Sequence, residues 1–380
     1  MQKKIKIVSF VIVLVILLIG IIVMNNNFNN KYSFTQDGIR YALTLDGNKV
    51  TSFPSKGMYK VQVTCVGADG KWLYDEWKLA IENITIDDVT CDIKFETIPK
   101  TNLNDYIVSL LGSEQGTGKV VNENGYRYEG KNPNNYIWFN NEYWRIIGVF
   151  DSASHGQANK NLVKIIRADI LDGIAWNKYI SNNWDTSSLK SLLNGAYYNA
   201  TDGTASGYCY GYSTTITANC DYTKKGIQSG YRGMIANVTW YLGGYSDNMA
   251  TAEALYGYER GTTVYSGRPT STTGYIGLMY PSDYGYSVLS SSCARTKVLY
   301  TYNTARCAGA SWLYGKGDAW TLTPNSSSSK YVLQFLDNGQ LSVSTNPFIG
   351  YGSRPVLYLD ASVYKIDGDG SLENPYIVGM

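Results

Sequence analysis

The chain has 380 residues, which is too long for one ordinary domain, so we expect two or three folded units. It carries 33 basic and 31 acidic residues, a formal net charge of +2, and this balance argues against nucleic acid as a partner. Six cysteines and one histidine, with no C-x-x-C pair, argue against a zinc site and predict disulfides. We expect no metal and no cofactor.

The amino-terminal segment predicts a membrane anchor. Residues 7–24 form an uncharged run of 18 residues, mostly Ile, Val and Leu. As a helix, at about 1.5 Å per residue, this run spans roughly 27 Å, enough for a bilayer core. Lys3, Lys4 and Lys6 precede the run and place residues 1–6 in the cytoplasm. We therefore expect a signal anchor at the plasma membrane, single-pass, with the rest of the chain outside the cell; the alternative is a cleaved signal peptide.

Residues 32–98 are expected to form a small β-sandwich. Apolar and polar residues alternate over 59–65, 77–81 and 89–95, the period of half-buried strands. Several short strands separated by turns are typical of a sandwich. We expect this module to serve as a stalk that lifts the next domain off the membrane.

A disulfide is expected to stabilise this module. Cys65 and Cys91 are its only cysteines, so we expect them to bond to each other. Closing a loop of about 27 residues stabilises the fold by roughly 3.5 kcal/mol on the chain-entropy model. A module this small has a limited core and benefits from such a bond.

Residues 99–124 are predicted to be a helical linker. Apolar residues recur at helical spacing over 102–111, and Gly112 follows as a stop signal. The glycines of 114–118 indicate a flexible segment. They do not form a phosphate-binding loop, because no lysine-serine pair follows and no strand precedes them.

Residues 125–380 are predicted to form an α+β domain with antiparallel strands, few helices and long loops. Asn140-Asn141 is a hairpin turn signal between two strands, and Asp337-Asn-Gly339 is another. The helix expected at 185–193 has capping residues at its start and Asn194-Gly195 as its stop. The other predicted elements are a weaker helix at 250–256 and strands at 136–139, 143–150, 162–169, 331–335, 340–343 and 356–359.

The remaining cysteines bracket two loops of this domain. Local pairing joins Cys209 to Cys220 and Cys293 to Cys307. These bonds close loops of about 12 and 15 residues, each contributing near 3 kcal/mol. Six cysteines permit fifteen connectivities, so the local pairing is a hypothesis.

Tyrosines supply the candidate ligand-binding residues. The chain has 34 tyrosines, and Tyr208, Tyr210, Tyr212 and Tyr222 lie in or beside the loop between two cysteines. Tyrosine rings offer flat, amphipathic contact area at a small entropic cost. With Tyr314, these residues are predicted to contact a glycan or protein ligand. The alternative is that the loop packs its rings on its own surface.

Other polar residues are interpreted as structural. Arg354 precedes an apolar strand, and we expect it to pair with a buried carboxylate or carbonyl. Asp367, Asp369 and Glu373 resemble part of a calcium loop, but the full ligand pattern is absent and a Gly-rich turn is favoured. His155 is expected in a loop without a catalytic triad.

Several segments resemble an uncharacterised family of surface proteins from Gram-positive gut bacteria. The matching segments cover 144–150, 183–189, 277–286, 320–324, 354–359 and 368–376. The first domain is similar to a module that often precedes the family's domain. The late order of a tryptophan strand, a polar strand pair and an arginine before an apolar strand looks like the end of C-type-lectin-like folds, including the formylglycine-generating-enzyme type. The family has no established activity to transfer, and likeness of fold bounds function only weakly.

Three functions follow as hypotheses. The first is a membrane-anchored surface protein that binds or adheres to glycan or protein ligands. The second is an envelope enzyme acting on polysaccharide, although no catalytic residues stand out and scattered acidic residues nominate no glycosidase pair. The third is a purely structural envelope protein. We favour the first.

Overall fold

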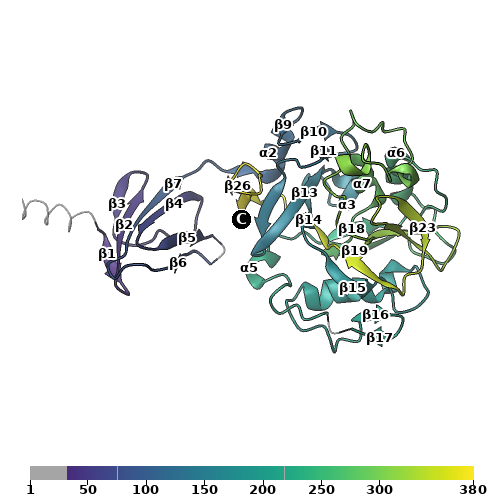
Figure 1. Cartoon of the computed structure of the whole chain (residues 1–380), viewed down its shortest axis with the longest axis horizontal. Coiled ribbons are helices and arrows are strands. Elements are labelled where there is room, and N and C mark those ends of the chain that lie inside the picture. Colours follow the sequence, from purple (N-terminus) through teal and green to yellow (C-terminus); the bar gives the residue numbers. More distant parts are fainter. Residues whose placement is uncertain (1–31, 75, 218) are drawn as a thin grey trace, which may run out of the picture. The chain divides into compact units, whose positions relative to one another are not determined.

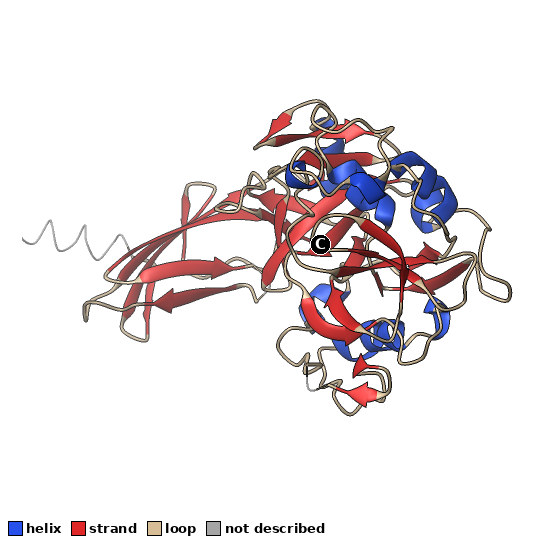
Figure 2. Cartoon of the chain, turned by 45° about the vertical axis from the view of Figure 1, so that its right-hand side comes forward, coloured by secondary structure: helices blue, strands red, loops and turns tan. Residues whose placement is uncertain are grey.

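The computed structural model describes residues 32–74, 76–217 and 219–380 (Figure 1). The chain divides into two compact units, the first ending at Pro99 and the second beginning at Lys100. Strands dominate, and the helices are short (Figure 2). The fold is therefore β-rich.

The expected membrane anchor at 7–24 and the cytoplasmic tail at 1–6 lie outside the described residues. No helix found from Tyr32 onward, in the parts of the chain that the structure describes, is both long and apolar enough to span a bilayer. The anchor stays a prediction.

The first unit contains a five-stranded sheet and a separate two-stranded hairpin. In the sheet, β2 lies parallel to β7, and β7 pairs antiparallel with β4. Its strands are β1 (Phe34–Gln36), β2 (Ile39–Leu45), β3 (Asn48–Val50), β4 (Tyr59–Val66) and β7 (Thr90–Thr97), and the hairpin is β5 (Asp69–Leu73) with β6 (Lys78–Glu82).

Alternate side chains of β2 and β7 fill the core of the first unit, because successive residues of a strand point to opposite faces. The buried residues of the two strands are Ile39, Tyr41, Leu43, Cys91, Ile93 and Phe95. Trp72 of the hairpin packs edge-on against Phe95, with ring centroids 5.1 Å apart. Cys65 and Cys91 lie directly opposite each other on β4 and β7 and form the predicted disulfide.

The segment expected to be a linker is part of the second unit. Its helix α2 (Leu103–Ser109) buries Leu103 and Ile107 completely. β10 (Gly118–Asn122) then pairs along its whole length with β11 (Tyr126–Gly130). The prediction of a linker over 99–124 is therefore corrected: the apolar face of the helix is covered by the core of the second unit.

The second unit is organised on an eleven-stranded sheet whose main path runs β20-β25-β14-β13-β12-β27-β26-β8. The side chains of β14 and β25 are buried along their entire lengths. Besides β10 and β11, the strands are β8 (Thr101–Asn102), β9 (Glu114–Gln115), β12 (Tyr136–Phe139), β13 (Glu142–Phe150), β14 (Leu162–Arg167), β20 (Ile276–Gly277), β25 (Val356–Leu359), β26 (Tyr364–Asp367) and β27 (Tyr376–Gly379).

A five-stranded sheet, ordered β15-β24-β21-β22-β23, and two hairpins complete the strands described in this unit. The sheet contains β15 (Leu171–Ala175), β21 (Ala319–Pro324), β22 (Val332–Phe335), β23 (Leu341–Thr345) and β24 (Gly350–Ser353). The hairpins are β16 (Tyr210–Tyr212) with β17 (Thr215–Ile216), and β18 (Val238–Tyr241) with β19 (Ser271–Gly274).

Asparagine makes the predicted turn between β12 and β13. Asn140 and Asn141 both adopt φ of 58°. Positive φ at both central residues is the geometry of a type I′ turn, whose twist matches that of the flanking strands. The Asn140 side chain is buried and accepts a hydrogen bond from the backbone of Gln228, at 2.7 Å.

The helices of the second unit are single short turns or little more. Besides α2 they are α3 (Ser152–His155), α4 (Ser188–Leu192), α5 (Ser229–Arg232), α6 (Ala252–Glu259) and α7 (Pro281–Ser287). Three 3-10 turns, η1 (Trp184–Thr186), η3 (Leu299–Thr301) and η4 (Ala308–Ala310), and one π turn, η2 (Leu193–Tyr197), accompany them.

The helix predicted at 185–193 begins later than expected, at Ser188, because residues 184–186 form the 3-10 turn η1 and the Ser187 side chain caps α4 by accepting from the Lys190 amide. The expected stop at Asn194-Gly195 is wrong. The chain continues through a π turn to Tyr197. The reason is tertiary: Asn194 donates to the Ile276 carbonyl at 2.8 Å and accepts from two amides of the same segment, which holds the turn in place.

Helix α7 was not predicted. Pro281 occupies its start, and the Asp283 side chain accepts from the Tyr280 backbone amide at 3.0 Å. Proline at the first position and an acidic residue at the third are ordinary helix-start signals. All residues of α7 are buried, so its sequence lacks the polar face that makes a surface helix recognisable.

The two cysteine pairs of the second unit bond as predicted, Cys209 with Cys220 and Cys293 with Cys307. With the pair in the first unit, they account for all six cysteines.

Candidate functional site

Two buried arginines line a hollow in the second unit. Arg145 is in the middle of β13, and Arg354 lies between β24 and β25. β14 separates β13 from β25 in the sheet, which brings the two arginines to one region. The hollow, called here the arginine hollow, has a volume of about 180 Å³. Its lining is Tyr136, Tyr143, Arg145, Ala168, Asp169, Trp312, Lys316, Arg354 and Leu372.

Arg145 is held in place by neutral groups. Its Nε donates to Asn135 Oδ1 at 2.5 Å, and its Nη2 donates to the Pro133 carbonyl at 3.2 Å. Its guanidinium carbon lies 3.8 Å from the centre of the Tyr136 ring and 4.9 Å from that of Trp312. Burial lowers the pKa of Arg145 to about 10, so the group remains cationic at neutral pH.

Arg354 is more deeply buried, with 2% of its surface exposed. Its Nε donates to the Arg167 carbonyl at 2.9 Å, so the expected pairing with a carbonyl is present. Its Nη1 is buried and has no hydrogen-bond partner among the described residues. Burial, and then the nearby charge of Arg145, lower the pKa of Arg354 to about 9. The fold thus encloses a cation that it does not neutralise.

The charges around the arginine hollow do not balance. Arg145, Lys316 and Arg354 line it as cations, and Asp169 lines it as a carboxylate. Asp169 is mostly exposed, and its Oδ1 lies 4.0 Å from Lys316 Nζ. Elsewhere in the unit the comparable arginine is paired: Arg167 contacts both oxygens of Glu142, at 3.0 and 2.9 Å from its Nε. Uncompensated buried charge is costly, so an anion in this hollow is strongly favoured.

A second hollow, called here the polar depression, adjoins the first. Its volume is about 780 Å³, and it shares Asp169 with the arginine hollow. The lining is mainly polar and includes two exposed lysines, Lys224 and Lys225. The full set is Arg167, Asp169, Ile170, Leu171, Asn219, Asp221, Tyr222, Thr223, Lys224 and Lys225.

The predicted ligand-binding tyrosines fall into two groups. Tyr208, Tyr212 and Tyr314 are 43%, 58% and 38% exposed, so their rings are available to a partner. Tyr210 and Tyr222 are 9% and 0% exposed, as expected for rings that pack on the protein itself. Binding by any of the five remains a prediction.

Only part of this tyrosine set lies beside the hollows. Tyr222 belongs to the wall of the polar depression, but its ring packs against Tyr197 with centroids 5.2 Å apart. Tyr314 adjoins the loop that carries Lys316 and lies near Arg354. Tyr208 and Tyr212 line neither hollow.

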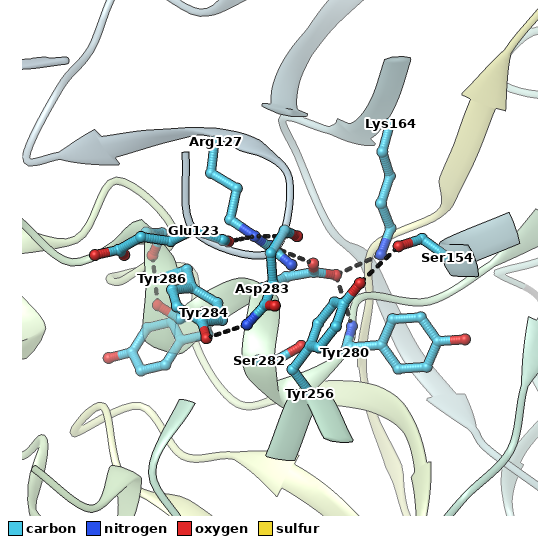
Figure 3. A network of polar contacts seen from close by, with 12 residues as sticks. Glu123, Arg127, Ser154, Lys164, Tyr256, Tyr280, Ser282, Asp283, Tyr284 and Tyr286 are labelled. Carbon is cyan, nitrogen blue, oxygen red and sulfur yellow. Dashed lines mark hydrogen bonds and ion pairs between the residues drawn. The ribbon is translucent and has the colours of Figure 1, made fainter. Parts of the chain in front are cut away.

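A cluster of buried ionised groups centres on Asp283 of α7 (Figure 3). Its carboxylate accepts from Lys164 Nζ at 2.5 Å and from Arg127 Nη1 at 3.0 Å. Burial raises the pKa of Asp283, but the two cations outweigh burial and hold it at about 2. Burial lowers the pKa of Lys164 to about 8, against the opposing effect of Asp283.

Glu259 of α6 extends this cluster. Its Oε1 accepts from the Ser282 amide at 2.8 Å, and its Oε2 lies 3.0 Å from Arg260 Nη1. Burial raises the pKa of Glu259 to about 7, although Arg260 and Ser282 act in the opposite direction. Perturbed pKa values often mark active sites. Here the side chains of Asp283, Lys164 and Glu259 are completely buried, so we assign the cluster to holding α6 and α7 against the sheet.

The acidic turn near the carboxyl terminus is held by its own backbone. Gly368 and Gly370 adopt φ of 85° and 81°, and Asp369 Oδ1 accepts from the Ser371 amide at 2.9 Å. Throughout the described ranges, no three His, Cys, Asp or Glu side chains are grouped to hold a metal ion. His155, expected in a loop, lies at the end of α3, where it is fully buried and its Nε2 is 3.1 Å from the Phe150 carbonyl.

Arg145, Lys316 and Trp312 were not predicted as site residues from the sequence. One signal was present: Arg145 interrupts a strand that is otherwise apolar, Trp144-Arg-Ile-Ile147. A charged residue inside a buried strand needs a partner or a function. Lys316 and Trp312 gave no comparable signal, because loop residues without periodicity are uninformative by themselves.

Comparison of the chain with known proteins finds no relative. No family model matches it, and neither does any curated protein or solved structure. The functional assignment therefore rests on the geometry of the second unit.

Proposed function

We propose that the chain is a membrane-anchored extracellular binding protein whose second unit recognises a glycan or protein ligand at the cell surface. In this proposal the second unit is a C-type-lectin-like domain and the first is a small β-sandwich stalk. The order of elements supports this assignment. Trp320 lies on β21, the strand pair β22–β23 follows, and Arg354 precedes the apolar strand β25.

The observation that carries the proposal is the arginine hollow with the adjoining polar depression. Arg354 is enclosed without a carboxylate partner, and aromatic rings flank Arg145. Convergent polar groups in a hollow, with aromatic walls, are typical of binding sites. A protein with only a structural role has no need to enclose an unneutralised cation, which costs stability.

The geometry favours binding over catalysis. Among the described residues, the carboxylates that line the hollows are Asp169 and Asp221. Hydrogen bonds from Thr223 lower the pKa of Asp221, whereas the general acid of a glycosidase needs a raised pKa. Glu259 has a raised pKa, but it is fully buried and out of reach of a polysaccharide.

Location outside the cell is supported by cysteine chemistry. All six cysteines are joined in disulfides, which persist in oxidising environments and are rare in the cytosol. The apolar run at 7–24, preceded by lysines, provides the proposed anchor.

A glycan array tests the proposal with the full chain purified in detergent. We expect selective binding to a subset of neutral or acidic glycans, with no change on addition of EDTA. An array without any selective signal removes glycan recognition. Pull-down from intact cells then distinguishes a protein ligand, which preserves the binding role, from no ligand at all, which contradicts it.

A further inference from the structure

We infer that the arginine hollow binds the carboxylate of an acidic sugar residue, and that the rest of the glycan extends over the polar depression. This inference rests on the proposed binding function and names its ligand class. It starts from the two guanidinium groups of Arg145 and Arg354, neither of which is hydrogen-bonded to a carboxylate of the described residues.

The arrangement of donors selects an oxyanion. Arg145 and Arg354 bond only to carbonyl and amide oxygens, which leaves both positive charges in place. Lys316 adds a third cation from a loop between two glycines that adopt φ of 81° and 76°. Arginine presents a planar fork of N–H donors that matches the two oxygens of a carboxylate, and such charge-assisted bonds are strong where water is excluded.

The size of the hollow limits how much ligand it takes. Pockets that enclose a whole small molecule measure roughly 300–1,000 Å³. The arginine hollow has about 180 Å³, so it holds one group of a larger molecule. The shared residue Asp169 connects it to the depression of about 780 Å³, where the remainder of the ligand extends.

The lining favours a sugar over an acidic peptide. Tyr136 and Trp312 flank the Arg145 guanidinium, and Tyr143 stands at the rim with 38% of its surface exposed. The exposed ring of Tyr143 gives a flat, amphipathic surface that suits the apolar face of a sugar ring. The polar depression supplies hydrogen-bonding groups and two lysines, whereas a peptide groove needs apolar pockets for its anchor side chains.

The exposed lysines of the polar depression favour a ligand that is a polymer with repeated acidic residues. Lys224 and Lys225 are exposed at its wall, and Asp221 beside them already accepts from the Thr223 amide at 3.0 Å. One carboxylate of the glycan occupies the arginine hollow. A second carboxylate of the same glycan therefore pairs with Lys224 and Lys225 in the polar depression. The protein thus recognises negative charge in both hollows, and the arginine hollow determines the specificity.

The test compares one ligand in two forms. A uronic-acid oligosaccharide and the same oligosaccharide with its carboxyl groups reduced to alcohols are titrated against the full chain in detergent, using calorimetry. We expect the reduced form to bind at least about 10-fold more weakly, since hydrogen bonds to charged groups are the stronger kind. A sialylated oligosaccharide and its reduced form test the other common source of sugar carboxylates.

Variants locate the effect. Lys316→Ala alters an exposed side chain at the hollow, and Lys297→Ala alters an exposed lysine that lines neither hollow. We expect the first variant to weaken binding of the acidic oligosaccharide by about 3- to 10-fold while leaving the reduced form unaffected, and the second to change neither. Arg145→Gln is expected to abolish the preference for the acidic form; its folding is checked by thermal unfolding, and the wild-type comparison stands without it.

The outcomes separate the inference from the function on which it rests. Equal binding of the acidic and reduced forms overturns the carboxylate inference but preserves glycan binding. Binding of an acidic peptide, and of neither form of the oligosaccharides, overturns the sugar assignment and keeps a protein ligand. If no glycan and no cell-surface protein binds, the proposed function itself fails.

Discussion

The carboxylate of Asp283 lies 2.5 Å from the ammonium group of Lys164, and both side chains are completely buried. Asp283 also caps α7 by accepting from the Tyr280 amide, and Lys164 is on β14, an interior strand of the large sheet. One carboxylate thus fixes the start of a buried helix and holds that helix to the sheet.

Removing this carboxylate is expected to destabilise the second unit strongly. Asp283→Asn leaves Lys164 and Arg127 buried without a counterion, which costs about 3–5 kcal/mol of unfolding free energy. Calorimetry of the full chain measures the change in the transition of this unit. Asp337→Asn, at an exposed hairpin turn, is the matched control and is expected to change stability by less than about 0.5 kcal/mol. Equal effects in the two variants contradict the role of the pair.

The same pair predicts sensitivity to acid. The pKa of Asp283 is held at about 2, below its ordinary value of 3.8. A group with a lowered pKa stabilises the fold fully above its unfolded-state pKa and loses that contribution as the pH falls. We therefore expect the second unit to lose stability between about pH 4 and pH 2, as measured by thermal unfolding at fixed ionic strength, and Asp283→Asn to flatten this dependence.

The raised pKa of Glu259 leads us to expect that the unfolding free energy decreases as the pH rises. Burial raises its pKa from 4.5 to about 7. Its contribution is complete below pH 4.5 and is lost as the pH rises through 7, at most about 3 kcal/mol for that separation. The difference in unfolding free energy between the wild type and Glu259→Gln, which stays neutral, isolates this effect from other titrations. A difference independent of pH between 4.5 and 7 contradicts it.

The backbone conformation of the turn between β12 and β13 leads us to expect a steric effect of substitutions at Asn141. Asn141 adopts φ of 58°, a conformation that costs branched residues about 1–2 kcal/mol. Asn141→Val is expected to lower the unfolding free energy by that amount, and Asn141→Gly to leave it within about 0.5 kcal/mol of the wild type. Denaturant unfolding measures both. Because Asn141 accepts a weak bond from Tyr231, at 3.3 Å, a similar loss in both variants assigns the effect to that bond instead.

Exposure separates the roles of the tyrosines. Tyr222→Ala removes a fully buried ring that packs on Tyr197, and we expect a loss of about 3–5 kcal/mol. Tyr208→Ala removes an exposed ring that lines neither hollow, and it is expected to change stability by less than about 0.5 kcal/mol. Weaker ligand binding by this variant is expected only if the ligand extends beyond the two hollows to Tyr208. Thermal unfolding and the glycan titration measure the two effects. Unchanged binding by Tyr208→Ala removes Tyr208 from the ligand contacts predicted from the sequence.

Local chemistry made much of the fold predictable. The Asn140-Asn141 turn and the Ser187 cap are set by neighbouring residues, so the sequence alone indicates them. The disulfides between Cys209 and Cys220 and between Cys293 and Cys307 close short loops and were predictable for the same reason.

The features that could not be predicted from the sequence depend on contacts between distant residues. The helix after Ser187 continues past its expected end because Asn194 bonds to the segment at Ile276. The arginine hollow joins Arg145, Lys316 and Arg354, which are more than 150 residues apart at the extremes. No periodicity or sequence spacing relates these three residues. The order of strands in the sheet, which brings β13 and β25 close together, cannot be inferred from the sequence of either strand alone.

The order of strands in the large sheet has a consequence for biosynthesis. β12 pairs with β27, and β8 pairs with β26. Strands from the start of the unit therefore pair with strands from its end. The sheet closes only after the ribosome has made residue 379, near the end of the chain. Pairings so distant in sequence form slowly, and open strand edges invite association with other chains. A premature stop that removes only residues 364–380 is therefore expected to prevent folding of the entire second unit.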